Sequence, residues 1–199
     1  MKFLLRILLF LFILVVLAAF LALFLPKDFH SERSGVIDAP PQVAYNQVNN
    51  LKNWNKWSPW AQIDPETKWE YSSDPVGEGA WYTWTSDHKD VGKGKLTIAE
   101  ATIGKTLKTE IEFEGMGTGY GTWKFEPQVD KTKVTWGFDT HVAWPFNLMM
   151  FNFDSQMGPS LEKGLTNLDK VSAEANRKMN EARERIKAKV RPPVNATPQ

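Results

Sequence analysis

An uninterrupted apolar run near the amino terminus constrains this chain more than any other feature. The nineteen residues Ile7 to Leu25 include no polar side chain, and sixteen of them are Leu, Ile, Phe or Val. As a helix the run is about 28 Å long, close to the hydrocarbon thickness of a bilayer. Transfer of these side chains into lipid is favourable by about 5 to 10 kcal/mol. The run therefore predicts a transmembrane segment.

A cleaved signal peptide is the alternative, because Ala18, Ala19 and Ala22 are small residues of the kind found at cleavage sites. The apolar run is longer than the roughly 7 to 15 residues usual in signal peptides, which favours an anchor. Lys2, Arg6 and the amino terminus outnumber the basic residues that follow the run. By the positive-inside rule we expect a single-pass protein of the inner membrane whose domain lies outside the cytoplasm.

Composition divides the rest of the chain. We expect residues 1–26 to form the anchor, 27–33 a short polar linker, and 34–172 one domain of ordinary size. Residues 173–191 extend the last helix and are rich in Lys and Arg, whereas 192–199 have the composition of a disordered tail.

The residue counts exclude several classes of function. A net charge of +1 offers no field for nucleic acid, and the absence of cysteine excludes disulfides, thiolate catalysis and cysteine-bearing metal sites. His30, His88 and His141 are not paired at ligand spacing, so we expect no metal and no cofactor. Asp139 and His141 form the one plausible acid–base pair, but Asp139 falls on the predicted wet face of a strand, which argues against catalysis.

Apolar periodicity predicts a short strand at 34–38, then a helix opened by Pro40 and Pro41. From residue 68 the period changes to two, as in strands with one buried face. The clearest alternation sets Leu107, Thr109 and Ile111 against lysine and glutamate. About seven strands result, mostly in a meander, the later ones near 69–72, 80–85, 95–99, 107–113, 123–125 and 134–138.

A long helix is expected after Gly158 and Pro159, because apolar residues recur at steps of three and four from Leu161 to Val190. It would be about 48 Å long, whereas seven strands make a sheet only about 30 Å wide. Its last turns should therefore project past the domain. This basic projection suits a solvated helix, contact with anionic lipid head groups, or pairing with a partner protein's helix.

Two aromatic stretches stand apart from the periodic elements. Trp54, Trp57 and Trp60 share one side of a helical turn and need an apolar mass behind them, either a core or a cavity wall. The stretch 144–151 is an apolar connection that suits a packed crossover, or a gate or membrane-touching lip over a pocket.

Five motifs in succession give the chain a family resemblance. They are Val36 to Pro40 with Val43, Leu51 to Trp60, Gly79 to Trp84, Thr132 to Trp136 and Leu161 to Leu168. In this order the chain resembles the START-like, polyketide-cyclase and lipid-transport superfamily, also called SRPBCC. The resemblance implies an α+β helix-grip fold, a curved antiparallel sheet of about seven strands around the long C-terminal helix, here preceded by one transmembrane helix.

The resemblance also implies a pocket for lipids, sterols, polyketides or isoprenoids. Inward-facing positions supply its expected lining: Trp57, Trp60, Trp84, Leu96, Ile98, Leu107, Ile111, Phe113, Trp123, Phe125, Val134 and Trp136. We therefore expect membrane-anchored binding of a hydrophobic small molecule or lipid. Two alternatives stay open, a cyclase- or dehydratase-type enzyme and a scaffold that pairs through its C-terminal helix. Catalytic residues differ between subfamilies, and none can be carried over, so an enzyme is not implied.

Overall fold

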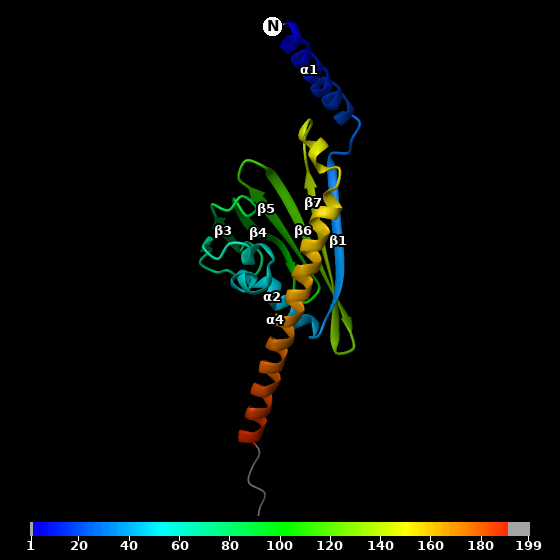
Figure 1. Ribbon diagram of the computed structural model, residues 1–199. Helices are drawn as coiled ribbons and strands as arrows, with labels where there is room; N and C mark the ends of the chain where they lie inside the picture. Colours follow the sequence, from blue (N-terminus) through cyan, green and yellow to red (C-terminus); the bar gives the residue numbers. More distant parts are fainter. Residues whose placement is uncertain (1, 191–199) are drawn as a thin grey trace, which may run out of the picture.

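The computed structural model describes residues 2–190 and arranges one antiparallel sheet against one long helix (Figure 1). The helices are α1 (Lys2–Ala22), α2 (Pro41–Asn49), α3 (Trp54–Trp57) and α4 (Phe153–Val190), with 3₁₀ turns η1 (Leu51–Asn53), η2 (Trp60–Gln62) and η3 (Phe146–Met150). The strands are β1 (Asp28–Ile37), β2 (Lys68–Tyr71), β3 (Trp81–Thr85), β4 (Lys93–Thr102), β5 (Thr106–Phe113), β6 (Gly117–Gln128) and β7 (Lys131–His141).

The sheet is a meander with one added strand. Its order is β1-β7-β6-β5-β4-β3-β2, so each strand from β2 to β6 pairs with the next along the chain, and β1 pairs with β7. Short hairpins make such consecutive pairing the simplest route for an antiparallel sheet. This sheet, packed against α4 and preceded by an apolar helix, confirms the predicted helix-grip architecture.

The stretch 28–33, predicted as a linker, instead forms the first half of β1. All ten residues of β1 pair with β7, from Asp28 opposite His141 to Ile37 opposite Thr132. The polar composition that suggested a linker belongs to an edge strand, where charged side chains are tolerated and discourage pairing with other chains. His30 and Asp139 also lie opposite each other, with 2.7 Å between Nδ1 and Oδ1.

These cross-strand contacts resolve the one acid–base pair that the sequence suggested. Asp139 contacts His30, while His141 contacts Asp28 at 2.7 Å, so Asp139 and His141 belong to two separate surface pairs. All four side chains are largely exposed. They link β1 to β7 at the end of the sheet where α1 enters the domain.

Helix α4 begins at Phe153, ahead of Gly158 and Pro159, after which the sequence predicted its start, so Pro159 lies inside it. The proline is close enough to the amino-terminal end that few backbone hydrogen bonds are lost. Gly158 lets the guanidinium of Arg33 lie against the helix, since a Cβ there would collide with it. Arg33 then bridges Asp154 and Glu162, one helical turn to either side, with Nη1–Oδ1 and Nε–Oε1 distances of 2.9 Å. Its hydrogen bonds lower the pKa of Asp154 to about 2.

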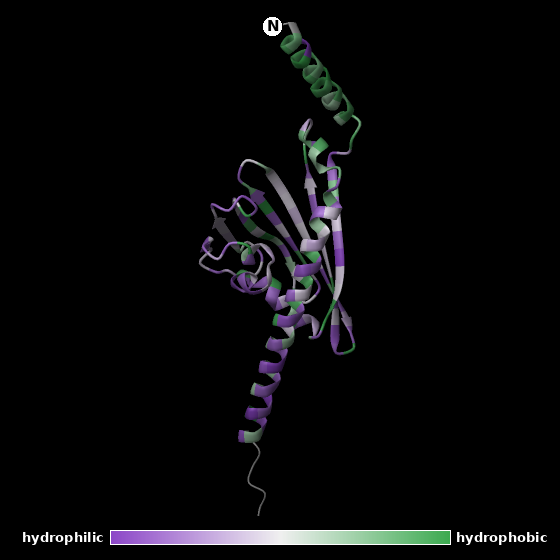
Figure 2. Cartoon of the chain, in the orientation of Figure 1, coloured by the Kyte–Doolittle hydropathy of each residue, from purple (hydrophilic) through white to green (hydrophobic). Residues whose placement is uncertain are grey.

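The second half of α4 leaves the sheet. Leu161, Leu165 and Leu168 are buried in the core, whereas every side chain from Asn180 to Lys189 is exposed. Figure 1 shows the last turns extending beyond the sheet, and Figure 2 shows that they are mainly hydrophilic. The predicted tail, 192–199, lies outside the described residues.

Helix α1 stands away from the sheet at the opposite end of the molecule from the last turns of α4 (Figure 1). Beyond Arg6 it is apolar all round, and within the span Phe3–Ala22 only Ala22, at the carboxyl end, is buried. Only its carboxyl end meets the domain, where it contacts η3. Exposure of this apolar surface to water is unfavourable.

Substitution of Gly164 by alanine should destabilise the fold. A Cβ at this position would lie 2.5 Å from Cζ3 of Trp136 and 3.3 Å from Cδ of Pro59. Alanine favours an exposed helix by about 1 kcal/mol, but overlap with a packed ring costs about 1 to 3 kcal/mol. We expect Gly164→Ala to lower the free energy of unfolding by about 1 kcal/mol or more, measured by urea titration of tryptophan fluorescence. The exposed Thr166→Ala, two residues away, is the control; a more stable Gly164→Ala protein would show that α4 packs loosely here.

Candidate hydrophobic ligand-binding site

A cavity of about 190 Å³ lies between the first turns of α4, the aromatic turn α3–η2 and the inner face of the sheet. Eight aromatic side chains and five aliphatic ones form most of its wall. The lining residues are Trp54, Ser58, Trp60, Trp69, Tyr82, Trp84, Lys89, Asp90, Val91, Leu96, Thr109, Ile111, Phe113, Met116, Trp136, Phe138 and Met157. A concave, mostly apolar wall with few polar groups is typical of small-molecule sites.

Two stacked tryptophans join this wall to the adjoining core, because Trp136 borders the cavity and Trp123 does not. Trp123 of β6 and Trp136 of β7 lie directly opposite each other in register, with ring centroids 4.2 Å apart and planes only 19° apart. Trp57 meets both rings edge to face, at 5.6 and 5.8 Å. Cross-strand aromatic pairs of this kind stabilise a sheet beyond the area that they bury. Trp136 is therefore held in place in the cavity wall by the core beside it.

Glycines on the inner face make room for the large rings. Gly94 lies beside the ring of Trp84, and Gly119 beside that of Phe138, on the neighbouring strand in each case. A Cβ at either glycine would collide with the ring. Both rings can therefore lie flat along the sheet, where they line the cavity without filling it.

Side-chain hydrogen bonds fix the turn that closes one side of the cavity. The indole N–H of Trp54 donates to the carbonyl of Val48 at 2.7 Å, and that of Trp57 donates to Gln47 at 3.1 Å. Asn167 of α4 donates to the carbonyl of Trp57 at 3.1 Å. The turn is thus attached both to α2 and to α4, which sets the distance between the helices and the sheet.

The mouth of the cavity lies among loops. Lys89, Asp90 and Val91 come from the β3–β4 loop, Met116 from the β5–β6 turn, and Met157 from the start of α4. Met116 is 74% exposed. Flexible methionines at such a rim can adapt to ligands of different shape.

Six of the twelve residues predicted as lining border this cavity. These are Trp60, Trp84, Leu96, Ile111, Phe113 and Trp136. The other six lie in the adjoining core: Trp57, Ile98, Leu107, Trp123, Phe125 and Val134. Trp57 belongs to α3, and the other five occupy the same face of the sheet as the wall, but toward the end that α2 covers, as the 5.5 Å contact between the rings of Tyr45 and Phe125 indicates. Periodicity identifies the inner face, but it does not identify the part of that face that another helix fills.

Several wall residues were not in the predicted lining. Tyr82 shares the inner face with Trp84 two residues away, and Phe138 continues the alternation of Trp136, so strand periodicity alone could have identified both. Trp81, by contrast, lies on the outer face, with the ammonium of Lys95 5.7 Å from its ring centroid. Met116 and Met157 come from a turn and a helix start, which carry no periodic signal.

Few ionisable groups reach the cavity. Tyr82 is buried, and that burial raises the pKa of its hydroxyl above the usual value. Lys89 and Asp90 are exposed at the mouth. Within residues 2–190 no group of three or more His, Asp or Glu side chains is placed to hold a metal ion. The chemistry of the wall is that of apolar contact.

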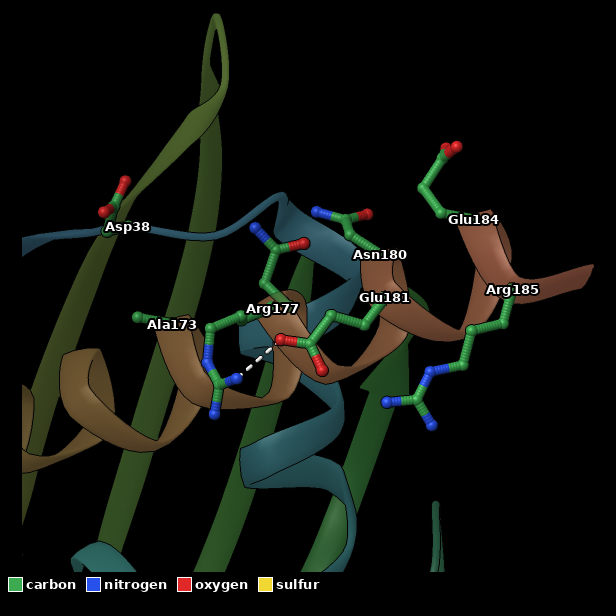
Figure 3. Close-up of a pocket in the computed structure, with 8 residues that line it drawn as sticks. Asp38, Ala173, Arg177, Asn180, Glu181, Glu184 and Arg185 are labelled. Carbon is green, nitrogen blue, oxygen red and sulfur yellow. Dashed lines mark hydrogen bonds and ion pairs between the residues drawn. The ribbon is translucent and has the colours of Figure 1, made fainter. Parts of the chain in front are cut away.

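A second hollow runs along the projecting part of α4 and is open to solvent (Figure 3). Apart from Asp38, all its lining residues come from this one helix. Arg177 and Glu181 within it pair with each other, 2.6 Å between Nη1 and Oε1. A surface groove of this kind encloses nothing, so the aromatic cavity is the better candidate site.

An internal apolar cavity between a long helix and a seven-stranded antiparallel meander defines the class of helix-grip proteins. A family model described as "Polyketide cyclase / dehydrase and lipid transport" matches residues 28–173, so the chain belongs to this family. The match includes β1 from its first residue and ends within α4, just before its projecting part.

Solved structures share the fold at low sequence identity. Protein CV1439 from Chromobacterium violaceum is 14% identical, with a TM-score of 0.52, and the match covers 74% of this chain and 99% of that one. Protein SA2116 from Staphylococcus aureus is 11% identical, with a TM-score of 0.55 and coverage of 74% and 98%. A protein from Arthrobacter aurescens is 14% identical, with a TM-score of 0.54 and coverage of 74% and 87%. No curated protein matches the chain.

Truncation of the tryptophans in the aromatic turn should distinguish a core residue from a residue of the cavity wall by the stability that is lost. Trp57 is fully buried among three aromatic rings, whereas Trp60 is only partly buried and contacts Trp136 at the edge of the cavity. We expect Trp57→Ala to lower the free energy of unfolding by about 3 to 5 kcal/mol, and Trp60→Ala by about 1 kcal/mol. Chemical denaturation of both variants checks this; equal losses would contradict the assignment of Trp60 to the wall.

Proposed function

We propose that this chain is a membrane-anchored protein that binds a hydrophobic small molecule or lipid in its aromatic cavity. The observation that supports this most is the enclosed apolar space between α4 and the sheet, in a family whose description includes lipid transport. Each buried methylene contributes about 0.8 kcal/mol, so a ligand of about ten carbons gains about 8 kcal/mol before the costs of association. Apolar contact alone can therefore support binding.

The anchor is the second part of the proposal, with residues 1–26 in the membrane and the domain outside the cytoplasm. The apolar span Phe3–Ala22 has 20 residues, enough to cross a bilayer. A cleaved signal peptide is the alternative, but α1 makes specific contacts with the domain. Trp144 Nε1 donates to the carbonyl of Ala19 at 2.8 Å, and Asn147 Nδ2 donates to that of Ala22 at 2.9 Å.

These contacts have the character of a helix cap. The last carbonyls of a helix have no partner within it, and Asn147 also lies within 3.3 Å of the carbonyls of Leu25 and Pro26. Asn147 is fully buried although it comes from the other end of the domain sequence. Cleavage after Ala22 would remove the carbonyls of Ala19 and Ala22 from Trp144 and Asn147 and leave Asn147 only those of Leu25 and Pro26, and this loss of contacts favours a retained α1.

Exposed apolar side chains next to the end of α1 support the same orientation. Trp144, Phe146, Met149 and Phe151 are 45 to 82% exposed around η3. Tryptophan and phenylalanine are favourable at the boundary between water and lipid. We propose that this end of the domain rests in the membrane interface, while the basic projection of residues 173–191 extends away from it.

The ligand proposal is tested by filling the cavity. Ile111 borders the cavity, so Ile111→Trp should occupy part of the space without straining the core, whereas Ile103→Trp adds the same volume at a site 72% exposed. Native mass spectrometry of the full chain, released gently from its own membranes, should detect a stoichiometric apolar adduct on the natural chain and on Ile103→Trp. The adduct should be lost from Ile111→Trp. An adduct of equal occupancy on all three would place the ligand elsewhere, and its absence from all three would contradict the proposal.

The anchor is tested on the mature protein. We expect the membrane fraction to retain the full chain after an alkaline wash, with an intact mass that includes residues 2–25. Leu14→Arg should weaken this retention, because a charged residue at the centre of a span costs about 2.5 to 3.5 kcal/mol. An intact mass that corresponds to a chain starting after Ala18, Ala19 or Ala22 would establish a cleaved leader instead.

A further inference from the structure

The projecting part of α4, residues 173–190, carries an apolar stripe past the end of the domain. Ala175 and Met179 are partly buried against the core, and Ala182 and Ile186 continue the same line of positions at steps of three and four. The last two are exposed, Ile186 by 62%. A projection that needed only to be solvated would be polar all round. Within the described residues, nothing covers this end of the stripe.

Basic side chains border the stripe on both sides. At about 100° per residue, Arg185 and Lys189 lie on one side of it and Arg183 on the other, each within about 90° around the helix. The acidic Glu181 and Glu184 lie on the opposite face of the helix. Figure 3 shows the side chains of Glu184 and Arg185 leaving the helix on different sides. Positive charge is thus concentrated beside the apolar residues, and negative charge away from them.

Neither the helix dipole nor ion pairing within the helix accounts for this arrangement. The dipole favours basic residues in the last turn, which here are Lys187 and Lys189. Three ion pairs join side chains within the projection: Lys178–Glu174, Arg177–Glu181 and Lys187–Glu184. Arg183 and Arg185 lie before the last turn and form no ion pair with any residue from 2 to 190. Both guanidinium groups are available to an acidic group outside the chain.

Charge argues against a second copy of this chain on the stripe. When two helices pair through apolar stripes, the residues that border one stripe face those that border the other. Both borders are basic here, so a parallel or an antiparallel pair of these helices would bring like charges together. The stripe therefore requires a partner with acidic borders.

The residue types of the stripe argue against a lipid surface. Binding of an amphipathic helix to a bilayer depends on the apolar area that enters it, which Trp, Phe and Leu supply best. Two of the four stripe residues are Ala, and none is Trp, Phe or Leu. Figure 1 also shows the projection directed away from α1, so the stripe does not lie along the membrane that α1 is proposed to span. Small residues alternating with Met179 and Ile186 suit close packing with a second helix.

We propose that the projection of α4 docks an acidic amphipathic helix of another protein. Apolar side chains of the partner pack on Ala182 and Ile186, and its carboxylates lie beside Arg183 and Arg185. The stripe is about 17 Å long from Ala175 to Ile186, which suits a small and reversible contact. This docking goes beyond the proposed binding function, because the exposed end of the stripe is remote from the cavity and its lining.

Two synthetic peptides test the chemistry of this face. Both have about four heptads with Leu at the two apolar positions; one has Glu at the bordering positions and the other has Lys. Each peptide carries a fluorescein label and is titrated with the full chain in phosphatidylcholine nanodiscs, and binding is measured by fluorescence anisotropy. Empty nanodiscs are the blank. The natural chain should bind the Glu-bordered peptide and discriminate against the Lys-bordered one.

Ile186→Asp and Ala188→Asp are matched variants, because each adds one negative charge to the same exposed turns and only Ile186 belongs to the stripe. We expect Ile186→Asp to weaken binding of the Glu-bordered peptide about tenfold or more, the effect of one buried isoleucine side chain. Ala188→Asp should weaken it by less than about threefold, as expected for one exposed charge. The double variant Arg183→Glu, Arg185→Glu should reverse the preference and bind the Lys-bordered peptide more tightly. Each variant should melt at the temperature of the natural chain, because these side chains are exposed beyond the core.

Several results would overturn the inference. Equal weakening by Ile186→Asp and Ala188→Asp would show that net charge alone attracts the peptide, and equal affinity for the two peptides would show that charge does not select the partner. Sedimentation of the nanodisc-bound chain with phosphatidylglycerol vesicles, lost in Ile186→Asp, would assign the stripe to lipid. Self-association of the chain that Ile186→Asp abolishes would assign it to a second copy. Absence of binding to both peptides would also contradict the docking, and it would leave the ligand adduct of the aromatic cavity unaffected.

Discussion

The stacked pair Trp123–Trp136, with Trp57 edge-on to both rings, is the contact on which the rest of the structure depends. It joins the two longest strands to the aromatic turn, and Gly164 brings α4 within contact of Trp136. Helix, turn and sheet therefore meet at one group of rings. The position of this group also decides where the packed core ends and the cavity begins, because α2 fills the inner face only on one side of it.

Hydrophobic periodicity predicted the sheet and its inner face, since the alternation of Leu107 with Ile111 and of Val134 with Trp136 can be read directly from the chain. It missed the first half of β1, because Asp28 and His30 look like linker residues until β7 supplies their partners, His141 and Asp139. Tertiary pairing of this kind has no local signal. The same limit applies to the lining, where Phe125 and Phe113 have equal periodicity and differ only in the presence of α2 above the first.

The cavity has its shape because several inward positions lack side chains. Gly94 and Gly119 accept the rings of Trp84 and Phe138, and Gly121 accepts the hydroxyl of Thr109. Large aromatic residues beside glycines produce a broad wall with little depth, unlike the interdigitated packing around Leu161 and Leu168. The aromatic residues and the glycines of the inner face thus determine together the volume of the cavity and the apolar character of its wall.

The length of α4 limits what its far end can touch. The helix starts beside η3, at the end of the domain that α1 enters, and its 38 residues extend for about 57 Å in the other direction. If α1 spans a bilayer, the basic turns around Arg183 and Arg185 stand tens of ångströms above that membrane. Electrostatic attraction decays over about 8 Å at physiological salt, so the head groups of the anchoring bilayer are out of range. Any anionic surface that these turns meet must come from the opposite direction.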